Sequence, residues 1–379
     1  MPSTLINNSD KVVIHQEAES MKISAVDLFC GVGGLTYGMQ RGGIPIAAGV
    51  DIDQACQYPY EANNDARFVL QDVTTLTAAM LRTLFSNADY RVLVGCAPCQ
   101  PFSSYSHGLS LKRDNRWSLL DSFGKLIAEV KPDVVSMENV IQLATQPIYR
   151  RFLKTLDRAG YSVSVSRVRC ADFGVPQTRK RLVVLASLHG KIKLREKGTA
   201  PAKTVRDAIG GLERIEAGGS SRHDRLHCSA SLSPVNLKRI RASRPGGTWH
   251  DWDVSIVSRC HRKKKGSSFR SVYGRMKWTE PSPTITTQFF KFGTGRFGHP
   301  EQDRALSLRE GAILQTFPKR YRFARRGEVI RFEHLGRLIG NAVPVKLGEA
   351  IGRSILTHLK SMDKTSLQPK LPTQGKTRR

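Results

Sequence analysis

Residues 23–34 decide the fold of this chain, and they read Ile23-Ser24-Ala25-Val26-Asp27-Leu28-Phe29-Cys30-Gly31-Val32-Gly33-Gly34. The apolar run at 23–29 predicts a buried strand, and a helical pattern over 34–41 follows the glycines. Such glycines let a ligand approach the backbone at the carboxyl end of a strand. A glycine loop alone is weak evidence, because a tight turn explains it equally well and Thr36 stands where the dinucleotide fingerprint needs its third glycine.

Strand and helix signals alternate through the first half of the chain. The strand signals lie at residues 23–29, 46–50, 68–70, 92–95 and 133–137, and a helical pattern at 119–130 precedes the last of them. Strands separated by helical segments predict βαβ units and a parallel sheet. Residues 161–168 alternate between apolar and polar, and residues 181–186 are apolar again. Both segments fit as closing strands of the same sheet. The sequence therefore predicts an α/β fold.

The charge of the chain is strongly unbalanced. Its 379 residues include 60 Lys and Arg against 32 Asp and Glu, a formal net charge of +28. Such an excess favours a polyanionic partner, most simply nucleic acid, over a merely solvated basic surface. Residues 188–278 hold 21 basic and 7 acidic residues, so half of the excess lies in a quarter of the chain. That segment is the predicted nucleic-acid contact.

Cellular location is predicted from what the sequence lacks. No apolar run approaches the roughly 18 residues that a membrane helix needs, so we expect no membrane association. The first 20 residues are polar and carry no signal-peptide pattern. Seven scattered cysteines argue for reduced thiols rather than a disulfide framework. A cytoplasmic protein is the expectation.

The organisation of the chain changes near Leu188, where the strand–helix alternation gives way to a Gly-, Ser-, Arg- and Lys-rich stretch. Ordered patterns return towards the C-terminus, with a last helix expected over 345–360. We predict an N-terminal extension (1–20), a sheet domain (21–187), a smaller basic domain (188–320), a segment returning to the sheet domain (321–360) and a disordered basic tail (361–379).

Aspartates follow two further predicted strands. Asp51 comes after the second strand, and its carboxylate can accept hydrogen bonds from a pair of ribose hydroxyls. Asp72 comes after the third and can accept from an exocyclic amine. Either aspartate alone is more often a helix cap or a solvated charge. Together with the glycine loop, at successive strand ends, they favour a nucleoside-type cofactor.

The fourth strand ends in Cys96-Ala97-Pro98-Cys99, which is formally a C-x-x-C motif. One interpretation is a redox pair, and another is half of a zinc site completed by His227-Cys228 or Cys260-His261. Neither of those pairs has the spacing of a second C-x-x-C. We favour a third interpretation, in which Cys99 is a single nucleophile and Cys96 is only a small residue at the strand end.

Three ordered motifs carry a family resemblance. They are Pro98-Cys99-Gln100, Glu138-Asn139-Val140 and Gln177-Thr178-Arg179-Lys180-Arg181, and Gly340-Asn341-Ala342-Val343-Pro344 follows them. With the glycine loop, they resemble the cytosine-C5 DNA methyltransferase family over nearly the whole chain. The resemblance implies a Rossmann-like methyltransferase sheet and a smaller, basic target-recognition domain. It also implies S-adenosylmethionine as cofactor, duplex DNA as substrate and no metal.

The resemblance implies a catalytic set of Cys99, Glu138, Arg181 and Arg179. A thiolate adding to C6 of cytosine makes C5 nucleophilic enough to take a methyl group, and sulfur adds and leaves readily. Glu138, as a protonated carboxyl, can stabilise the electron density that moves to N3, and it can accept a hydrogen bond from the N4 amine. Arg181 can donate to O2 and brace Glu138. Local cationic charge would favour the thiolate of Cys99.

The resemblance also implies the residues that hold the cofactor. Phe29, Gly31 and Gly33 would lie against its methionine portion, Asp51 against the ribose, and Ile52 and Asp72 against the adenine. Many relatives carry Glu and an aromatic residue where this chain has Asp51 and Ile52. The remaining cofactor residues implied are Pro98, Leu119, Asn341 and Val343.

The DNA contacts implied begin with Ser103, at a target phosphate. Base-edge contacts are often made by arginine to guanine, and phosphate contacts make affinity fall with salt. The candidates in the basic domain are Arg222, Arg225, Arg241, Arg244 and Arg275. A paired cytosine must be flipped out of the helix to meet Cys99, which costs a few kcal/mol.

The cellular role implied is that of a prokaryotic modification enzyme, acting as a monomer beside a cognate restriction endonuclease. Two alternatives stay open. The first is an RNA cytosine-C5 methyltransferase of the same fold, and the second is a DNA-binding regulator that has lost catalysis. The intact Cys99, Glu138 and Arg181 argue against the regulator.

Overall fold

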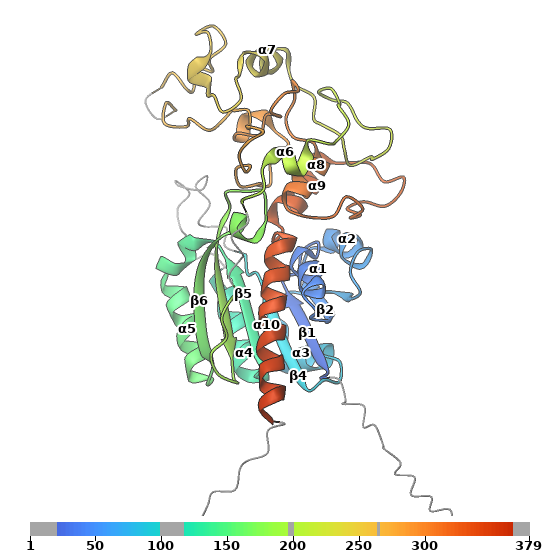
Figure 1. The fold of residues 1–379 in the computed structure, drawn as a ribbon, viewed down its shortest axis with the longest axis vertical. Helices are drawn as coiled ribbons and strands as arrows, with labels where there is room; N and C mark the ends of the chain where they lie inside the picture. Colours follow the sequence, from blue (N-terminus) through green and yellow to red (C-terminus); the bar gives the residue numbers. More distant parts are fainter. Residues whose placement is uncertain (1–20, 99–116, 196–200, 264–265, 367–379) are drawn as a thin grey trace, which may run out of the picture.

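A computed structural model describes residues 21–98, 117–195, 201–263 and 266–366 of the chain. Its centre is a seven-stranded sheet in the order β3-β2-β1-β4-β5-β7-β6 (Figure 1). The strands are β1 (Ile23–Leu28), β2 (Ile46–Asp51), β3 (Arg67–Leu70), β4 (Tyr90–Gly95), β5 (Val134–Asn139), β6 (Ser162–Arg169) and β7 (Lys180–Ser187). All seven predicted strands are therefore confirmed within one sheet.

The direction of the strands differs from the prediction at one end of the sheet. Strands β1 to β5 are parallel, as predicted, but β7 runs antiparallel to both β5 and β6. The ten residues between β6 and β7 hold only a short 3-10 turn, Cys170–Phe173, so the chain returns as a hairpin rather than through a crossover helix. As a result, the start of β7 lies beside the end of β5.

Helices cover both faces of the sheet. The helices are α1 (Gly34–Arg41), α2 (Gln57–Glu61), α3 (Ala78–Leu84), α4 (Trp117–Val130), α5 (Pro147–Arg158), α6 (Val205–Ile209), α7 (Pro234–Ala242), α8 (Leu308–Leu314), α9 (Phe332–Asn341) and α10 (Val345–Ser366). One core joins the sheet to α3, α4 and α5, and a second joins its other face to α1 and α10.

Glycines explain how the C-terminal helix returns to the start of the chain. A β-carbon on Gly38 would lie 2.3 Å from the carbonyl oxygen of Val345, and one on Gly352 would lie 2.9 Å from that of Met39. Helices α1 and α10 therefore pack backbone to backbone, with α10 lying along the sheet in Figure 1. Helix α10 continues beyond the predicted end at Lys360 to Ser366, so the tail predicted at 361–379 begins as helix.

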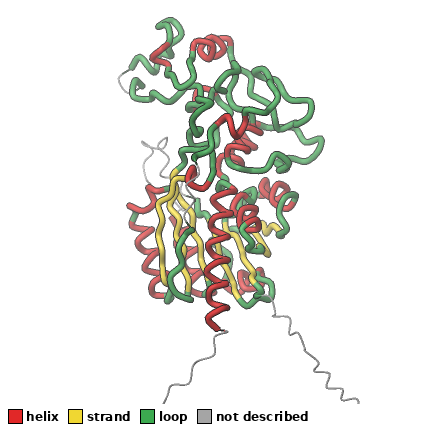
Figure 2. The backbone as a smooth tube through the Cα atoms, in the orientation of Figure 1, coloured by secondary structure: helices red, strands yellow, loops and turns green. Residues whose placement is uncertain are grey.

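The upper part of the molecule is built mostly of loops, as the green tube of Figure 2 shows. Its small core contains Ile240, Trp249, Trp252, Val272 and Phe292. Trp249 and Trp252 are buried in this core, whereas the nearby Phe269 is exposed. No helix among the described residues is long and apolar enough to cross a membrane.

Two residues just beyond the predicted domain boundary at Leu188 pack with the sheet part. Ile192 and Leu194 still pack in the core shared by the sheet, α1 and α10. A further core joins Val32 and Tyr60, from the sheet part, to Leu226 and Phe289 from the loop-rich part. The two parts therefore share a hydrophobic core at the carboxyl edge of β1 and β2.

Candidate active site

The carboxyl end of β5 carries a buried ion pair. Glu138 and Asn139 are the last residues of β5, and both are only 2% exposed. Because β7 is antiparallel to β5, Leu182 faces Asn139, which brings Arg181 to the same edge. The Nε of Arg181 lies 2.7 Å from Oε1 of Glu138. A charge pair buried this far is held in one geometry, so Glu138 is oriented by its partner.

The second oxygen of Glu138 has a partner that the sequence did not indicate. The thiol of Cys96, just after β4, donates to Oε2 of Glu138 at 2.9 Å. The interpretation of Cys96 as only a small residue was therefore wrong. One strand end supplies the carboxylate, and its two neighbours in the sheet supply a thiol and a guanidinium that fix it.

The segment that leads to Cys99 is tied to the same strand end. The side-chain amide of Asn139 donates to the carbonyl oxygen of Ala97 at 3.0 Å. The predicted nucleophile Cys99 and the predicted phosphate contact Ser103 lie outside the described residues. Pro98 is the last described residue before them and is exposed. The chain therefore leaves β4 with its backbone anchored beside Glu138.

Gln177 and Arg179 connect the sheet to a distant segment rather than to Glu138. Gln177 accepts a hydrogen bond from the backbone N–H of Ile285 at 3.0 Å, and Arg179 Nη1 donates to the carbonyl oxygen of Ile285 at 3.0 Å. Burial, with the nearby charge of Arg181, lowers the pKa of Arg179 to about 10. Arg179 still carries its charge at neutral pH, and its contacts there are structural.

The glycine loop at the end of β1 has the backbone of a ligand-binding turn. Phe29, Gly31 and Gly33 have φ values of 59°, 52° and 85°, in the left-handed region that glycine adopts freely. A β-carbon on Gly31 would meet no atom within 4 Å, whereas one on Gly33 would lie 2.4 Å from the side-chain nitrogen of Asn64. The loop is therefore packed on one side and open on the other.

Asp51 is held at the end of β2 by backbone donors. Its Oδ2 accepts from the N–H of Gly31 at 2.8 Å and its Oδ1 from the N–H of Asp53 at 2.9 Å. Burial raises the pKa of this carboxyl above its ordinary value, although these donors oppose the shift. A carboxylate oxygen can accept more than one hydrogen bond, so Asp51 keeps capacity for two ribose hydroxyls.

The residues around this loop fit a nucleoside-bearing ligand. Ile52 is 68% exposed, an apolar side chain next to Asp51 that an adenine face would cover. Asp72 accepts from the N–H of Thr74 at 2.8 Å and is half-buried, as is Leu119 on α4. The carbonyl oxygen of Val343 would lie 2.4 Å from a β-carbon on Gly34, so this segment packs against α1. The neighbouring Asn341 is exposed.

The sequence of this chain matches a known protein family over most of its length. Residues 23–357 match the family model described as C-5 cytosine-specific DNA methylase. This chain belongs to that family. Glu138 and Asn139, from the second of the motifs that carried the resemblance, therefore end a strand of a cytosine methylase.

Two relatives are similar over most of their own length. The Type II methylase M.HgiDII of Herpetosiphon aurantiacus is 46% identical over 344 residues, covering 89% of this chain and 96% of that protein. The Type II methyltransferase M1.HphI of Haemophilus parahaemolyticus is 31% identical, with 89% and 87% covered. A prophage-encoded E. coli structure described as a DNA modification methyltransferase shares the fold, with a TM-score of 0.69 at 22% identity over 89% of this chain and 99% of that one.

The five arginines predicted to contact DNA in this methylase are not equivalent. Arg222 is exposed. Arg241 and Arg244 are also exposed and lie 3.3 Å from Asp303 and 3.2 Å from Asp251. All three side chains are on the surface, so a contact with DNA stays a prediction for each of them.

Arg275 is buried, and the exposed Arg225 forms hydrogen bonds within the protein. Arg275 donates to the carbonyl oxygens of Ile240, Ser243, His299 and Gln302, pairs with Asp303 and is 5% exposed. The guanidinium of Arg275 is buried and its donors are already used, so it cannot reach a base edge. The prediction that Arg275 contacts DNA was therefore wrong. Arg225 donates to the carbonyl oxygens of Arg325 and Glu328 at 3.4 and 2.5 Å.

The zinc interpretation gains no support from the residues that the structure describes, where no three His, Cys, Asp or Glu side chains gather as metal ligands. The ring nitrogens of His227 lie 2.9 Å from the hydroxyl of Ser307 and 2.8 Å from the carbonyl oxygen of Glu213. Both nitrogens are therefore already engaged within the protein.

A buried aspartate behind the glycine loop was given no role from the sequence. Oδ2 of Asp27 accepts from the hydroxyl of Thr36 at 2.7 Å, and that hydroxyl lies 3.1 Å from the hydroxyl of Tyr60. Burial raises the pKa of Asp27 to about 7, and Asp51 adds to the rise. The sequence places Asp27 in the first predicted strand, but it does not show that Thr36 and Tyr60 lie beside it.

Proposed function

We propose that this methylase transfers a methyl group from S-adenosylmethionine to C5 of a cytosine flipped out of duplex DNA. The observation that carries the proposal is the Glu138–Arg181 pair, at 2.7 Å, at the strand end where Asn139 is hydrogen-bonded to Ala97. Family membership, the open glycine loop and the net charge of +28 support it.

Cys99 begins the proposed reaction by forming a bond between its thiolate sulfur and C6 of cytosine. Electron density then moves towards N3. Glu138, which must be protonated in the complex with cytosine, gives its proton to N3 and accepts a hydrogen bond from the N4 amine. Arg181 donates to O2 and keeps Glu138 oriented. C5 takes the methyl group, its proton passes to a base, the sulfur–C6 bond breaks and the N3 proton returns to Glu138.

The cofactor would be held at the β1–β2 end of the same edge. When bound, S-adenosylmethionine supplies a methyl group on a positively charged sulfur. Gly31 and Gly33 would let its methionine portion approach the backbone, and Asp51 would accept the ribose hydroxyls. Ile52 would pack on the adenine, Asp72 would accept from its amine, and Leu119, Asn341 and Val343 would border it.

The cellular role we propose is protection of DNA from a cognate restriction endonuclease, with the methylase acting as a monomer. The support is the Type II designation of both relatives, at 46% and 31% identity. No contact between methylase and endonuclease is required, because the methyl mark itself carries the protection.

The test is methyl transfer from tritiated S-adenosylmethionine to bacterial genomic DNA free of cytosine methylation, with transfer RNA in parallel. We expect label in DNA only, recovered as 5-methylcytosine after digestion to nucleosides. Label in transfer RNA instead would support the RNA methyltransferase alternative. DNA binding without label in either substrate would support the catalytically inactive regulator.

A further inference from the structure

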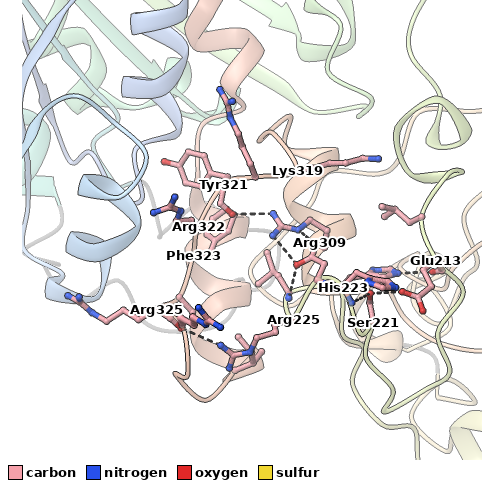
Figure 3. A pocket seen from close by; sticks show the side chains of 18 of the residues that line it. Glu213, Ser221, His223, Arg225, Arg309, Lys319, Tyr321, Arg322, Phe323 and Arg325 are labelled. Atoms are coloured by element: carbon pink, nitrogen blue, oxygen red, sulfur yellow. Dashed lines mark hydrogen bonds and ion pairs between the residues drawn. The ribbon is translucent and has the colours of Figure 1, made fainter.

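A basic pocket lies away from the proposed cytosine site. Its volume is about 790 Å³, and it is bordered by Tyr58 of α2, the loop at 211–227 and the segment at 319–330 (Figure 3). Seven Lys and Arg residues line it, against the two acidic residues Glu213 and Asp224. The positive charge of these side chains is not balanced by the two carboxylates, so the pocket suits an anion.

Five of the seven cations belong to one segment, which we call the basic row. It consists of Lys319, Arg320, Arg322, Arg325 and Arg326. Arg325 lies over the ring of Tyr58, with 4.6 Å between its guanidinium carbon and the ring centroid. The other four side chains form no ion pair or hydrogen bond with any described part of the protein. All five are exposed.

The two remaining cations hold the pocket together. Arg309 pairs with both carboxylate oxygens of Asp224, at 2.5 and 3.1 Å. Arg225 fastens the turn at residues 325–328 through the carbonyl oxygens of Arg325 and Glu328. These internal contacts separate two structural arginines from a row of cations that faces outward.

The backbone of the basic row is held in place by contacts with the rest of the protein, so the positions of its side chains are defined. Tyr321 and Phe323 are buried and alternate with the exposed Arg320 and Arg322. The hydroxyl of Tyr321 donates to the carbonyl oxygen of Val32 at 2.5 Å. Asn63 at the end of α2 both donates to and accepts from the backbone of Arg322, each at 2.8 Å.

The position of the row separates it from the base site. The residues that hydrogen-bond the row, Asn63 and Val32, follow β2 and β1. Glu138 lies at the end of β5, and Arg181 lies at the start of β7. Three strand intervals separate β2 from β5 in the sheet, about 14 Å in all. A ligand bound to the row is therefore not the flipped base. A DNA duplex whose flipped cytosine lies at the end of β5 has backbone phosphates on either side of that base, and these are available to the row.

We propose that the basic row binds backbone phosphates of duplex DNA outside the recognised sequence. Lys and Arg side chains that neutralise phosphates release counterions and add affinity that does not depend on sequence. This inference rests on the proposed function for the identity of the polyanion. It adds a second contact surface, which holds the enzyme on DNA independently of base recognition.

The test measures how non-specific affinity depends on salt, with a random-sequence duplex as the probe. The variant combines Lys319→Ala, Arg320→Ala and Arg322→Ala, and the matched control combines Arg150→Ala, Lys154→Ala and Arg158→Ala on the exposed face of α5. Each removes three exposed cations that form no ion pair with a described residue. Circular dichroism and thermal unfolding verify that both variants fold.

The slope of log Kobs against log salt decides the outcome. Each phosphate contact contributes about 0.9 to this slope, so the row variant should lose about 2 to 3 and the control less than about 1. An unchanged slope in the row variant, or an equal loss in the control, overturns the inference. The measurement needs no methyl transfer, so a wild-type enzyme that fails to methylate DNA would sink the proposed function separately.

Two further arms identify the source of the phosphate. Binding of inorganic tripolyphosphate is followed by calorimetry, and binding of duplex RNA is measured with the same salt series. A row variant that loses tripolyphosphate binding but keeps its DNA slope would make the pocket a small-anion site. One that loses slope only on RNA would make it an RNA surface. Either result overturns the inference.

Discussion

The two ends of the sheet's carboxyl edge are built in different ways. At β5 and β7, the side chains of Glu138, Arg181 and Cys96 hold one another through contacts of 2.7 and 2.9 Å. At β1 and β2, backbone N–H groups hold Asp51, and the space in front of Gly31 is open. One end fixes reactive groups, and the other offers a shaped backbone to a ligand.

This difference separates turnover from binding. Substitutions at the β5–β7 end should lower the rate of the chemical step with little change in cofactor affinity. Substitutions at the β1–β2 end should do the reverse.

Glu138→Gln should have the largest effect. The amide keeps the size of the side chain but cannot deliver a proton to N3, and it leaves Arg181 without its charge partner. Proton transfer by a positioned group contributes about 10²- to 10⁴-fold, so single-turnover methyl transfer should fall by about 10³-fold. Glu129→Gln on α4 is the control. A comparable loss of S-adenosylmethionine affinity would break the separation between the two ends.

Asp27→Asn tests the buried group behind the glycine loop through its pH dependence. Burial raises the native pKa of Asp27 to about 7 from the ordinary 3.8, so the native state holds this proton more tightly than the unfolded state. Wild-type stability should therefore decline as pH rises from about 4 to 7. The variant does not titrate there, so its free energy of unfolding relative to wild type should rise by an amount on the order of 4 kcal/mol.

Denaturant unfolding of both proteins at pH 5 and pH 8 measures the part of that difference that falls above pH 5, which is about 2 to 3 kcal/mol. A gap between variant and wild type that is the same at both pH values would show that Asp27 does not titrate in this range.

Asp51→Asn should weaken S-adenosylmethionine binding by about tenfold. The amide nitrogen cannot accept from the N–H of Gly31 or Asp53, and the loss of one such hydrogen bond costs about 1.5 kcal/mol. Calorimetric titration gives the affinity, and methyl transfer at saturating cofactor should stay near the wild-type rate. A fall in the saturated rate that exceeds the fall in affinity would contradict this assignment.

Cys96 should give the smallest effect and the most selective one. Cys96→Ala removes the donor to Oε2 of Glu138 and should slow transfer by about three- to tenfold. Cys96→Ser keeps a donor and should recover most of the rate. Equal rates for the two variants would leave Cys96 with a packing role only.

The parallel half of this fold could be predicted from the sequence because apolar runs and helical patterns alternate there. The antiparallel β7 could not, since periodicity carries no strand direction. That direction is what brings Arg181 to Glu138. The family resemblance implied that Glu138 and Arg181 act together, and the register between β5 and β7 explains how they meet.

Other residues depend on contacts that no local pattern reports. Cys96 meets Glu138 across two strands, 42 positions apart in the chain. Arg275 stands in a basic, weakly periodic segment, where its burial among backbone carbonyls left no trace in the sequence. Arg225 likewise fastens a turn 100 residues away. The basic row was not singled out, because its alternation with Tyr321 and Phe323 resembles an ordinary exposed strand.

The central claim is that the thiol of Cys99 attacks C6 of a cytosine in DNA. Duplex DNA synthesised with 5-fluorodeoxycytidine in place of deoxycytidine carries a trap at every site, since fluorine cannot leave C5 as a proton does. With S-adenosylmethionine, the wild-type enzyme should form a covalent complex that survives denaturing electrophoresis, and Cys99→Ser should form none. A complex that persists in Cys99→Ser, or none in a wild type that methylates ordinary DNA, would contradict the account.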